Sequence, residues 1–153
     1  MRVRFVPTGS LRGLVVRTAF RGGFAEAVTA DGRLVARAPG RSSLHRLLAR
    51  LGLKRAAGPA PRAREAAAEG TRFRAAVWQA CLTVPWGRTV TYGSLARKVA
   101  CRSARAVGGA LAANPLAGVI PCHRVVAAGG AGGFAWGGAR KRRWLRKEAR
   151  GPA

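Results

Sequence analysis

The first part of the chain contains short runs in which hydrophobic and polar residues alternate. Residues 23–30 and 33–39 are two such runs, and Asp31-Gly32 stands between them. An Asp-Gly pair between alternating runs is typical of a β-hairpin, because both residue types accept the backbone conformations of its tight turn. Leucines then recur at helical spacing over residues 44–51, and Ser42 or Ser43 can cap the helix that they predict.

The stretch after this helix is rich in proline, glycine and alanine and poor in large apolar residues. Its composition predicts a mobile linker over residues 59–70, with a short helix at residues 63–69. We therefore expect a short N-terminal α/β domain over residues 1–58 and a second domain over residues 71–153.

The second domain begins with a helical pattern in which Phe73, Val77 and Cys81 share one face, with Trp78 and Leu82 beside them. The turn residues Pro85-Trp86-Gly87 then end the segment.

Two short helices are predicted next. Thr91 and Ser103 are suitable N-cap residues for them, and Asn114-Pro115 ends the second helix. Two short helices joined by a tight turn form the outline of a helix-turn-helix. A glycine-rich loop and a basic C-terminal helix complete the chain. The expected fold class is α+β, with a small N-terminal α/β domain followed by a mainly helical C-terminal domain that contains the helix-turn-helix.

The net charge narrows the range of partners. Twenty-nine Lys and Arg residues against five acidic residues give a formal net charge of +24. Such an excess repels itself in a compact protein, so it is usually matched by an anionic partner. Nucleic acid is the first candidate, because neutralising phosphates releases counterions and gives strong binding. A compositional bias toward arginine and alanine is the alternative explanation of the charge.

Several classes of protein are disfavoured. The three cysteines are an odd number without a CxxC pair, which argues against a disulfide framework. The two histidines do not lie at zinc-finger spacing from paired cysteines, so we predict no metal. No stretch approaches the ~18 apolar residues of a membrane span, and the N-terminus is too polar for a secretory signal. We therefore expect a cytoplasmic protein.

The adjacent residues Cys122 and His123 are the candidate reactive pair. A cysteine reacts as the thiolate, and a free thiol with a pKa near ~8.5 needs a base or a positive environment to form it at neutral pH. Neighbours on a strand point to opposite faces, but a turn at Pro121 can bring the thiol and the imidazole together, directly or through one water molecule. An adjacent Cys-His pair alone is more often structural than catalytic.

The wider sequence around this pair is more specific. Asn114-Pro115, then PCHRVV over residues 121–126 and then a glycine-rich loop resemble the O6-alkylguanine-DNA alkyltransferase family. The similarity covers residues 71–149 and includes the strings TVTYGSLA, ARAVGGALAANP, IPCHRVV and GFAWGGARK–KEA. It implies direct DNA repair, in which an alkyl group, such as methyl, moves irreversibly from O6 of guanine, and also from O4 of thymine, to an internal cysteine. The enzyme is consumed in a single turnover.

The family roles can be carried over residue by residue. Cys122 matches the alkyl-accepting cysteine, His123 the neighbouring base, and Glu148 the carboxylate that orients this base. Asn114 resembles the asparagine that ties the helix-turn-helix to the cysteine turn. Tyr92 resembles the tyrosine that helps to rotate the nucleotide and hydrogen-bonds guanine N3. Glu148 also stands out independently, because it is the only acidic residue among residues 71–153.

The resemblance also implies a set of residues that contact DNA or the flipped base. Arg105 resembles the arginine finger that fills the gap left by the extruded base. The other residues of this set are Ser103, Arg124, Val125, Phe134 and Ala135. The chain departs from the family where Phe134 replaces a common tyrosine and Ala135 a common hydroxyl residue, so two hydroxyls that recognise the base are missing.

The implied partner is double-stranded DNA containing O6-alkylguanine, bound by a monomer that needs no cofactor and, in a prokaryote, is associated with the nucleoid. The main alternative is a catalytically inactive alkyltransferase-like protein that senses damage by binding DNA. Such proteins lack the acceptor cysteine, so Cys122 argues against this alternative. A helix-turn-helix regulator needs base-reading side chains, whereas residues 104–113 are nearly all Ala, Gly, Val and Leu. A cysteine peptidase needs a characteristic arrangement of a separated histidine and an oxyanion hole, and no such pattern is visible in the sequence.

Overall fold

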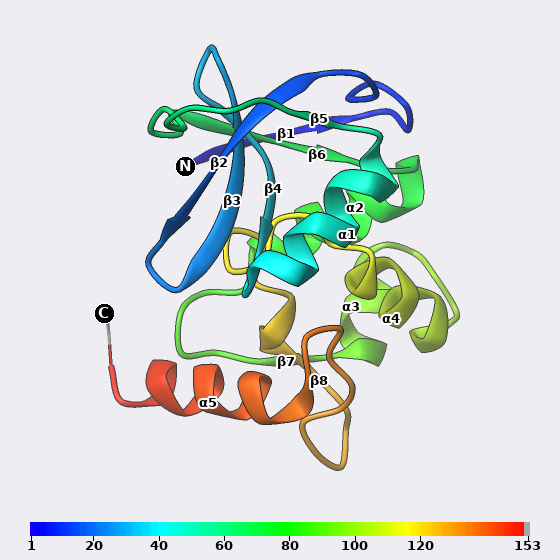
Figure 1. Ribbon diagram of the computed structural model, residues 1–153. Helices are drawn as coiled ribbons and strands as arrows, with labels where there is room; N and C mark the ends of the chain where they lie inside the picture. Colours follow the sequence, from blue (N-terminus) through cyan, green and yellow to red (C-terminus); the bar gives the residue numbers. More distant parts are fainter. Residues whose placement is uncertain (152–153) are drawn as a thin grey trace. The chain divides into compact units, whose positions relative to one another are not determined.

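The structure is a computed structural model that describes residues 1–151, and these residues divide into two compact units (Figure 1). The first unit contains Met1–Ala75 and a later segment, Pro115–Val119. The second unit contains Ala76–Asn114 and the chain from Ile120 onward. The polypeptide therefore leaves the first unit, returns to it for five residues and leaves it again.

The first unit is built on a mixed six-stranded sheet with the order β1-β6-β4-β3-β2-β5. The β2–β3 and β3–β4 pairs are antiparallel, whereas β1–β6, β4–β6 and β2–β5 are parallel. The strands are β1 (Arg2–Val6), β2 (Val15–Arg21), β3 (Phe24–Thr29), β4 (Arg33–Ala38), β5 (Lys54–Arg55) and β6 (Glu65–Glu69).

The predicted β-hairpin is confirmed as β3 and β4. Gly32 in its turn has a φ of +84°, a left-handed conformation that glycine adopts without strain. The Thr29 hydroxyl hydrogen-bonds the Asp31 carboxylate and holds the turn from within. The local sequence is therefore sufficient to specify this part of the sheet.

The leucine-rich helix is α1 (Arg41–Leu51), and its buried residues are the four leucines of the predicted pattern. Together with Val16, Val35 and the small residues of β3 and β4, they form the hydrophobic core of this unit. The predicted cap at Ser42 or Ser43 is wrong. The N-cap is Gly40, which has no side chain to donate or accept, and both serines lie inside the first turn.

The structure corrects the prediction for residues 63–69. They contain the strand β6, which lies between β1 and β4, rather than a mobile linker or a helix. The alanines at 66–68 are fully buried, because their small side chains fit a crowded sheet interior. The Glu69 carboxylate accepts hydrogen bonds from the backbone N–H groups of Gly9, at 2.8 Å, and Leu11, at 2.6 Å. Pairing with distant strands thus outweighs the helix propensity of alanine.

The returning segment Pro115–Val119 is attached to β4 within the first unit. The Arg37 N–H donates to the Pro115 carbonyl at 2.8 Å, and the Ala117 N–H donates to the Arg37 carbonyl at 3.1 Å. The Arg37 guanidinium adds a 2.7 Å bond to the Ala117 carbonyl and a 3.1 Å ion pair with Glu26. One arginine thus fixes the segment through both its backbone and its side chain.

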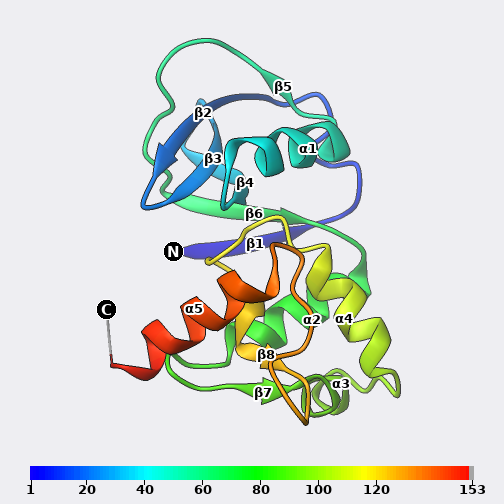
Figure 2. The ribbon, with the colours of Figure 1, turned by 60° about the horizontal axis from the view of Figure 1, so that its bottom comes forward.

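The second unit is mainly helical. In Figures 1 and 2, α3 and α4 lie together at one side of it, α5 lies at the other, and the two-stranded parallel sheet of β7 and β8 lies between them. The elements from residue 72 onward are α2 (Arg72–Leu82), β7 (Val90–Thr91), α3 (Tyr92–Lys98), α4 (Ala104–Ala112), the 3-10 helix η1 (Cys122–Arg124), β8 (Val125–Val126) and α5 (Gly138–Ala149).

The predicted caps of the second unit are confirmed. The Thr91 hydroxyl accepts from the Ser94 N–H, and the Ser103 hydroxyl accepts from the Ala106 N–H, each at 3.1 Å. These bonds satisfy backbone donors that a helix start leaves unpaired. Serine and threonine at these positions therefore set where α3 and α4 begin.

The apolar face of α2 is narrower than predicted. Val77, Trp78 and Cys81 are buried, whereas Phe73 and Leu82 are 38% and 37% exposed. The Trp78 indole donates to the Ala110 carbonyl at 2.8 Å and so joins α2 to α4. With a mixed sheet in one unit and helices in the other, the predicted α+β fold class is confirmed. No helix within residues 1–151 is long and apolar enough to cross a bilayer.

Candidate active site

A pocket of about 630 Å³ in the second unit brings together residues from four separate segments. α3 contributes its first residue, α4 one face, η1 the cysteine, and the loop before α5 three consecutive residues. The lining residues are Tyr92, Ala104, Arg105, Gly108, Leu111, Ala112, Cys122, Gly133, Phe134 and Ala135. Five of the residues predicted from the sequence, Tyr92, Arg105, Cys122, Phe134 and Ala135, thus line one cavity, whose volume is typical of a small-molecule site.

Cys122 lines this pocket and is only 4% exposed. The Asn114 side-chain amide donates to the Cys122 Sγ at 3.2 Å and to the Ile120 carbonyl at 3.0 Å. Asn114 is itself buried, so both bonds are shielded from water. The amide therefore orients the sulfur and joins the end of α4 to the cysteine turn.

The Cys122 thiol is a weak acid in the free protein. Burial raises its pKa from 9.0 to about 11, although the Asn114 hydrogen bond and the positive charge of Lys141 both favour the thiolate. The thiol is therefore almost entirely protonated at neutral pH. The sulfur therefore needs a base to take its proton during a reaction.

His123, which follows Cys122 in the sequence, is the candidate for that base, and Glu148 holds it in place. The His123 Nε2 lies 2.6 Å from the Glu148 Oε1, and both side chains are almost completely buried. The Nδ1 atom of the same ring is buried and has no hydrogen-bond partner among residues 1–151. With Nε2 donating to the carboxylate, Nδ1 carries the free lone pair that can accept a proton.

Glu148 is held by a second basic residue. The Arg124 guanidinium donates to the Glu148 Oε2 at 2.8 Å and to the Oε1 at 3.1 Å, while the Gly87 N–H donates to the Oε2 at 3.3 Å. Burial opposes ionisation of this carboxyl, but the bonds from Arg124 and His123 outweigh it and keep the pKa of Glu148 below its usual value. Glu148 is therefore ionised at neutral pH.

The pKa of His123 is lowered, although its carboxylate partner Glu148 alone would raise it. Burial lowers this pKa, and the hydrogen bond and negative charge of Glu148 offset the burial only in part. The positive charges of Arg124 and Lys141 lower it further. His123 is therefore neutral at pH 7, the state in which a ring nitrogen can accept the thiol proton.

Lys141 on α5 is the functional candidate that sequence reasoning missed. Its side chain is completely buried, and its Nζ donates to the Val125 carbonyl at 2.5 Å, the Gly133 carbonyl at 3.0 Å and the Tyr92 hydroxyl at 3.3 Å. Burial lowers the pKa of Lys141, and the nearby Cys122 raises it in part. Lys141 thus brings a proton donor to the wall of the pocket.

A spacing in the sequence could have identified Lys141. It lies within the run Arg140–Arg143, where it is easily taken for one more surface cation. However, it precedes Glu148 by seven residues, which is close to two turns of an α-helix. Once Glu148 is assigned to the inside, Lys141 must lie on the same face of α5.

Tyr92 is fixed between the pocket loop and Lys141. Its hydroxyl donates to the Gly133 carbonyl at 3.0 Å and accepts from the Lys141 Nζ. Burial, and to a lesser degree Cys122, raise the pKa of Tyr92. The close approach of its ring requires glycine at position 132, where φ is +74° and a Cβ would lie 2.8 Å from a ring carbon. The glycine-rich loop therefore allows the tyrosine to form this wall.

The remaining predicted residues are not all at the pocket. Ser103 is exposed and serves as the N-cap of α4, and the Val125 side chain is fully buried, with only its carbonyl used by Lys141. The Arg124 guanidinium binds Glu148 and the Val84 carbonyl, so its donors point into the protein instead of toward a ligand. Contacts of these three residues with DNA stay predictions.

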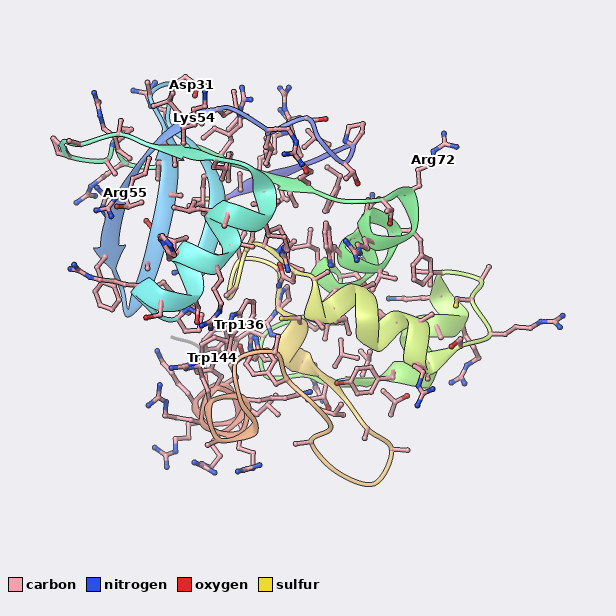
Figure 3. The ribbon with its side chains drawn as sticks, turned by 45° about the vertical axis from the view of Figure 1, so that its right-hand side comes forward. Asp31, Lys54, Arg55, Arg72, Trp136 and Trp144 are labelled. Atoms are coloured by element: carbon pink, nitrogen blue, oxygen red, sulfur yellow. The ribbon has the colours of Figure 1, made fainter. Side chains whose placement is uncertain are left out.

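An aromatic cluster supports the pocket loop and the histidine. The Phe134 ring lies 5.4 Å from the Trp136 ring and 5.5 Å from the Trp144 ring, in edge-to-face arrangements. Trp144 also meets the His123 ring edge-on at 5.2 Å. Figure 3 shows Trp136 and Trp144 close together beside α5. Phe134 therefore keeps a fixed position although it lacks a hydroxyl.

Comparison with known proteins identifies relatives of the second unit and of the fold. Residues 72–150 match the model of the DNA-binding domain of 6-O-methylguanine DNA methyltransferase. The chain is 50% identical over 82 residues to the Escherichia coli bifunctional transcriptional activator/DNA repair enzyme Ada; the match covers 52% of this chain and 23% of that protein. It is 47% identical over 87 residues to the methylated-DNA–protein-cysteine methyltransferase of Mycobacterium tuberculosis, covering 55% and 53% of the two chains.

Solved structures match nearly the whole chain. The crystal structure of Mycobacterium tuberculosis OGT in complex with DNA has a TM-score of 0.66 and 27% identity, covering 90% of this chain and 94% of that one. The O6-methylguanine-DNA methyltransferase of Pyrococcus kodakaraensis has a TM-score of 0.63 and 28% identity, covering 88% and 98%. In the sequence comparisons, by contrast, the matched region is about a quarter to a half of the curated relatives' length.

Proposed function

Because the chain belongs to the 6-O-methylguanine DNA methyltransferase family, we propose that it repairs DNA by moving an alkyl group from O6 of guanine to its own Cys122. The observation that carries this proposal is a pocket lined by the almost fully buried Cys122, whose sulfur accepts a hydrogen bond from the Asn114 amide. The same chemistry extends to O4-alkylthymine, in which the alkylated oxygen is likewise bonded to a carbon of the base ring. An intact acceptor cysteine disfavours a protein that only senses damage.

The transfer is a displacement at the alkyl carbon. His123 Nδ1 accepts the thiol proton, directly or through one water molecule, and the sulfur attacks the carbon as a thiolate. The S–C bond forms while the C–O6 bond breaks, and the electron pair of that bond stays on O6. The guanine anion then takes up a proton and His123 gives up the one it accepted, directly or through water, so the products are a thioether on Cys122 and an ordinary guanine.

The pocket contains proton donors for the leaving base. Negative charge develops on guanine as the C–O6 bond breaks, and donors placed there in advance stabilise the transition state. When guanine is bound, the Tyr92 hydroxyl can turn its proton from the Gly133 carbonyl to guanine N3, and Lys141, which donates to that hydroxyl oxygen, makes it a stronger donor. A backbone N–H of the loop at Ala135, which lines the pocket, can bind O6.

The thioether explains why the protein acts once. A thioether sulfur has no easy leaving group, so the alkyl group stays on Cys122 and the protein is consumed. No cosubstrate or cofactor takes part in this scheme. The expected stoichiometry is therefore at most one alkyl group for each monomer.

The proposed partner is double-stranded DNA. O6 of a paired guanine lies inside the duplex, so the nucleotide must rotate out of the stack at a cost of a few kcal/mol. In our proposal α3 and α4 act as the helix-turn-helix, and the small residues of α4 allow its backbone to approach the minor groove closely. The net charge of +24 supplies a general attraction to phosphates. The protein then works in the compartment that holds the DNA.

The intact mass of the protein tests this proposal. After incubation with duplex DNA containing O6-methylguanine, the mass should rise by one methyl group in place of one hydrogen. The modified peptide should be the one that contains Cys122. Repair beyond one equivalent of protein, or a methyl group on another residue, would contradict the suicide mechanism.

Arg105→Ala should slow the repair of duplex DNA about 10-fold or more, while transfer from the free base O6-benzylguanine should change less than about 3-fold. Arg105 is exposed on the first turn of α4 at the pocket rim, where its guanidinium can stack in place of the extruded base. A free base needs no flipping, so it does not use this contact. Single-turnover rates on the two substrates measure the difference.

The control for this experiment is Arg88→Ala, which removes an exposed arginine of the second unit that does not line the pocket. It should lower DNA binding modestly and change both rates by similar small factors. If Arg105→Ala slows duplex and free-base reactions equally, Arg105 shapes the pocket and is not the arginine finger.

A further inference from the structure

A second hollow lies beside the pocket loop, on the outer side of α5. It is lined by Trp136, Gly137, Ala139, Arg140, Arg143 and Arg146. The three arginines are spaced three residues apart, so they rise on successive turns along the same side of the helix. Figure 3 shows nitrogen-tipped side chains fanning outward from α5. The hollow therefore presents several guanidinium groups to solvent at one place.

The charge of this hollow has no counterpart on its own helix. The only acidic residue of α5 is Glu148, which is 5% exposed and bonded to His123 and Arg124. Within residues 1–151, no ion pair involves Arg140, Arg143 or Arg146. Like charges one turn apart destabilise a helix, and a bound anion removes that repulsion.

The hollow is also partly organised before a ligand arrives. The Arg140 Nη1 donates to the Trp136 carbonyl at 3.1 Å, which holds this guanidinium against the loop. The Trp136 ring packs edge-on against Phe134, and Phe134 lines the Cys122 pocket. Residues 133–135 thus face the pocket, while Trp136 and Gly137 line the hollow. One short loop separates the two.

We propose that this hollow binds backbone phosphates of the same DNA strand whose nucleotide enters the Cys122 pocket, on one side of that nucleotide. Guanidinium groups bind phosphate oxygens through paired N–H donors, which suits three arginines around a concave surface. A strand with one nucleotide in the pocket carries its next phosphates within a few nucleotides of the loop. The inference rests on the proposed function, because it takes the pocket to hold a nucleotide of DNA.

The test compares two triple variants in a Cys122→Ser background, so that no alkyl group moves during the measurement. The hollow variant is Arg140→Gln/Arg143→Gln/Arg146→Gln. The control is Arg12→Gln/Arg46→Gln/Arg62→Gln, which removes three exposed arginines of the first unit. Its net charge equals that of the hollow variant. Thermal unfolding checks that both variants fold as the parent does.

Equilibrium binding to a 20-base-pair duplex with one O6-methylguanine is then measured over a range of salt concentrations. At 100 mM salt the affinity of the hollow variant should be lower than that of the parent by about 10-fold or more. The magnitude of its slope of log affinity against log salt should be smaller by about 2 to 3. The control should lose less than about 3-fold and keep its slope. Equal slopes for parent, hollow variant and control would overturn the proposal.

Neutral methylphosphonate linkages, placed one at a time along the lesion strand, locate the phosphates. The parent should lose affinity at two or three adjacent linkages on one side of the lesion, and the hollow variant should be insensitive at those linkages. If no linkage at a fixed distance from the lesion distinguishes the two proteins, the arginines bind some other DNA segment and the proposal fails. A failure of the proposed function is separate, since it appears as an absent mass shift in the wild-type protein.

Discussion

Cys122→Ser is expected to abolish alkyl transfer while leaving DNA binding within about 3-fold of the wild type. Serine preserves the size of the side chain and can still accept the Asn114 hydrogen bond. Its hydroxyl, however, is a far weaker acid and nucleophile than a thiol, so His123 cannot generate a useful attacking group. Intact-mass measurement after long incubation with O6-methylguanine DNA should detect no methylated protein.

Cys101→Ser is the matched control for this substitution. Cys101 is partly exposed, its sulfur bonds to the backbone of Ser103 in the turn before α4, and it does not line the pocket. This variant should transfer at the wild-type rate within about 2-fold. If transfer persists in Cys122→Ser and disappears in Cys101→Ser, the acceptor is Cys101 and the assignment of Cys122 is wrong.

Glu148→Gln is expected to slow transfer about 100-fold or more at neutral pH. The amide has the size of the carboxylate but no charge, and it can donate to the His123 Nε2. The histidine proton would then move to Nδ1, the atom that must accept the thiol proton. Loss of the negative charge also lowers the pKa of His123 further, which makes it a weaker base. Single-turnover rates between pH 6 and 9 measure the change.

The same substitution has a separate effect on stability. Burial disfavours the charged form of Glu148, but Arg124 and His123 more than compensate, so its folded pKa lies below the ordinary 4.5. A carboxyl group whose pKa is lowered on folding stabilises the folded state fully at pH values above its ordinary pKa. This stabilisation is lost as the pH falls through the folded pKa. The free energy of unfolding of the wild type, measured with urea, should therefore fall below about pH 4.5. The Glu148→Gln variant should lack this part of the fall.

Glu65→Gln is the control for both measurements. Glu65 is a partly exposed carboxylate of β6 that pairs with Arg4 and Arg33. Exposed pairs contribute about 0–1 kcal/mol, so this variant should keep the wild-type transfer rate and lose little stability. If Glu148→Gln keeps the wild-type transfer rate, as Glu65→Gln does, and changes only the stability, then Glu148 is a structural residue only.

The parts of the fold that the sequence predicts are those fixed by neighbouring residues. The hairpin at Asp31-Gly32, the leucine face of α1 and the caps at Thr91 and Ser103 all depend on contacts within a few positions. β6 is different, because its alanine-rich sequence favours a helix and only its pairing with β1 and β4 makes it a strand. Such pairing joins residues about 30 to 60 positions apart, which local periodicity cannot reveal.

The candidate site shows the same division. Cys122, His123 and Glu148 are identified by residue type and by resemblance, and the structure brings the histidine and the glutamate within hydrogen-bond distance. Two features of the site depend on which cationic side chains are buried, and the sequence of charges does not indicate this. Lys141 is buried within a run of cations, and Arg124 binds the Glu148 carboxylate although the resemblance implies a contact with DNA. A basic residue in a basic sequence gives no local sign of which way it points.

The return of residues 115–119 to the first unit affects how this protein can be divided for expression. A fragment that begins at residue 76 keeps the sequence of the second unit but loses β4, to which Pro115 and Ala117 are hydrogen-bonded through Arg37. Leu116, which is fully buried in the whole chain, would then meet water in the stretch between Asn114 and Cys122. The two units are therefore interwoven in sequence, and a single cut cannot produce two self-sufficient pieces.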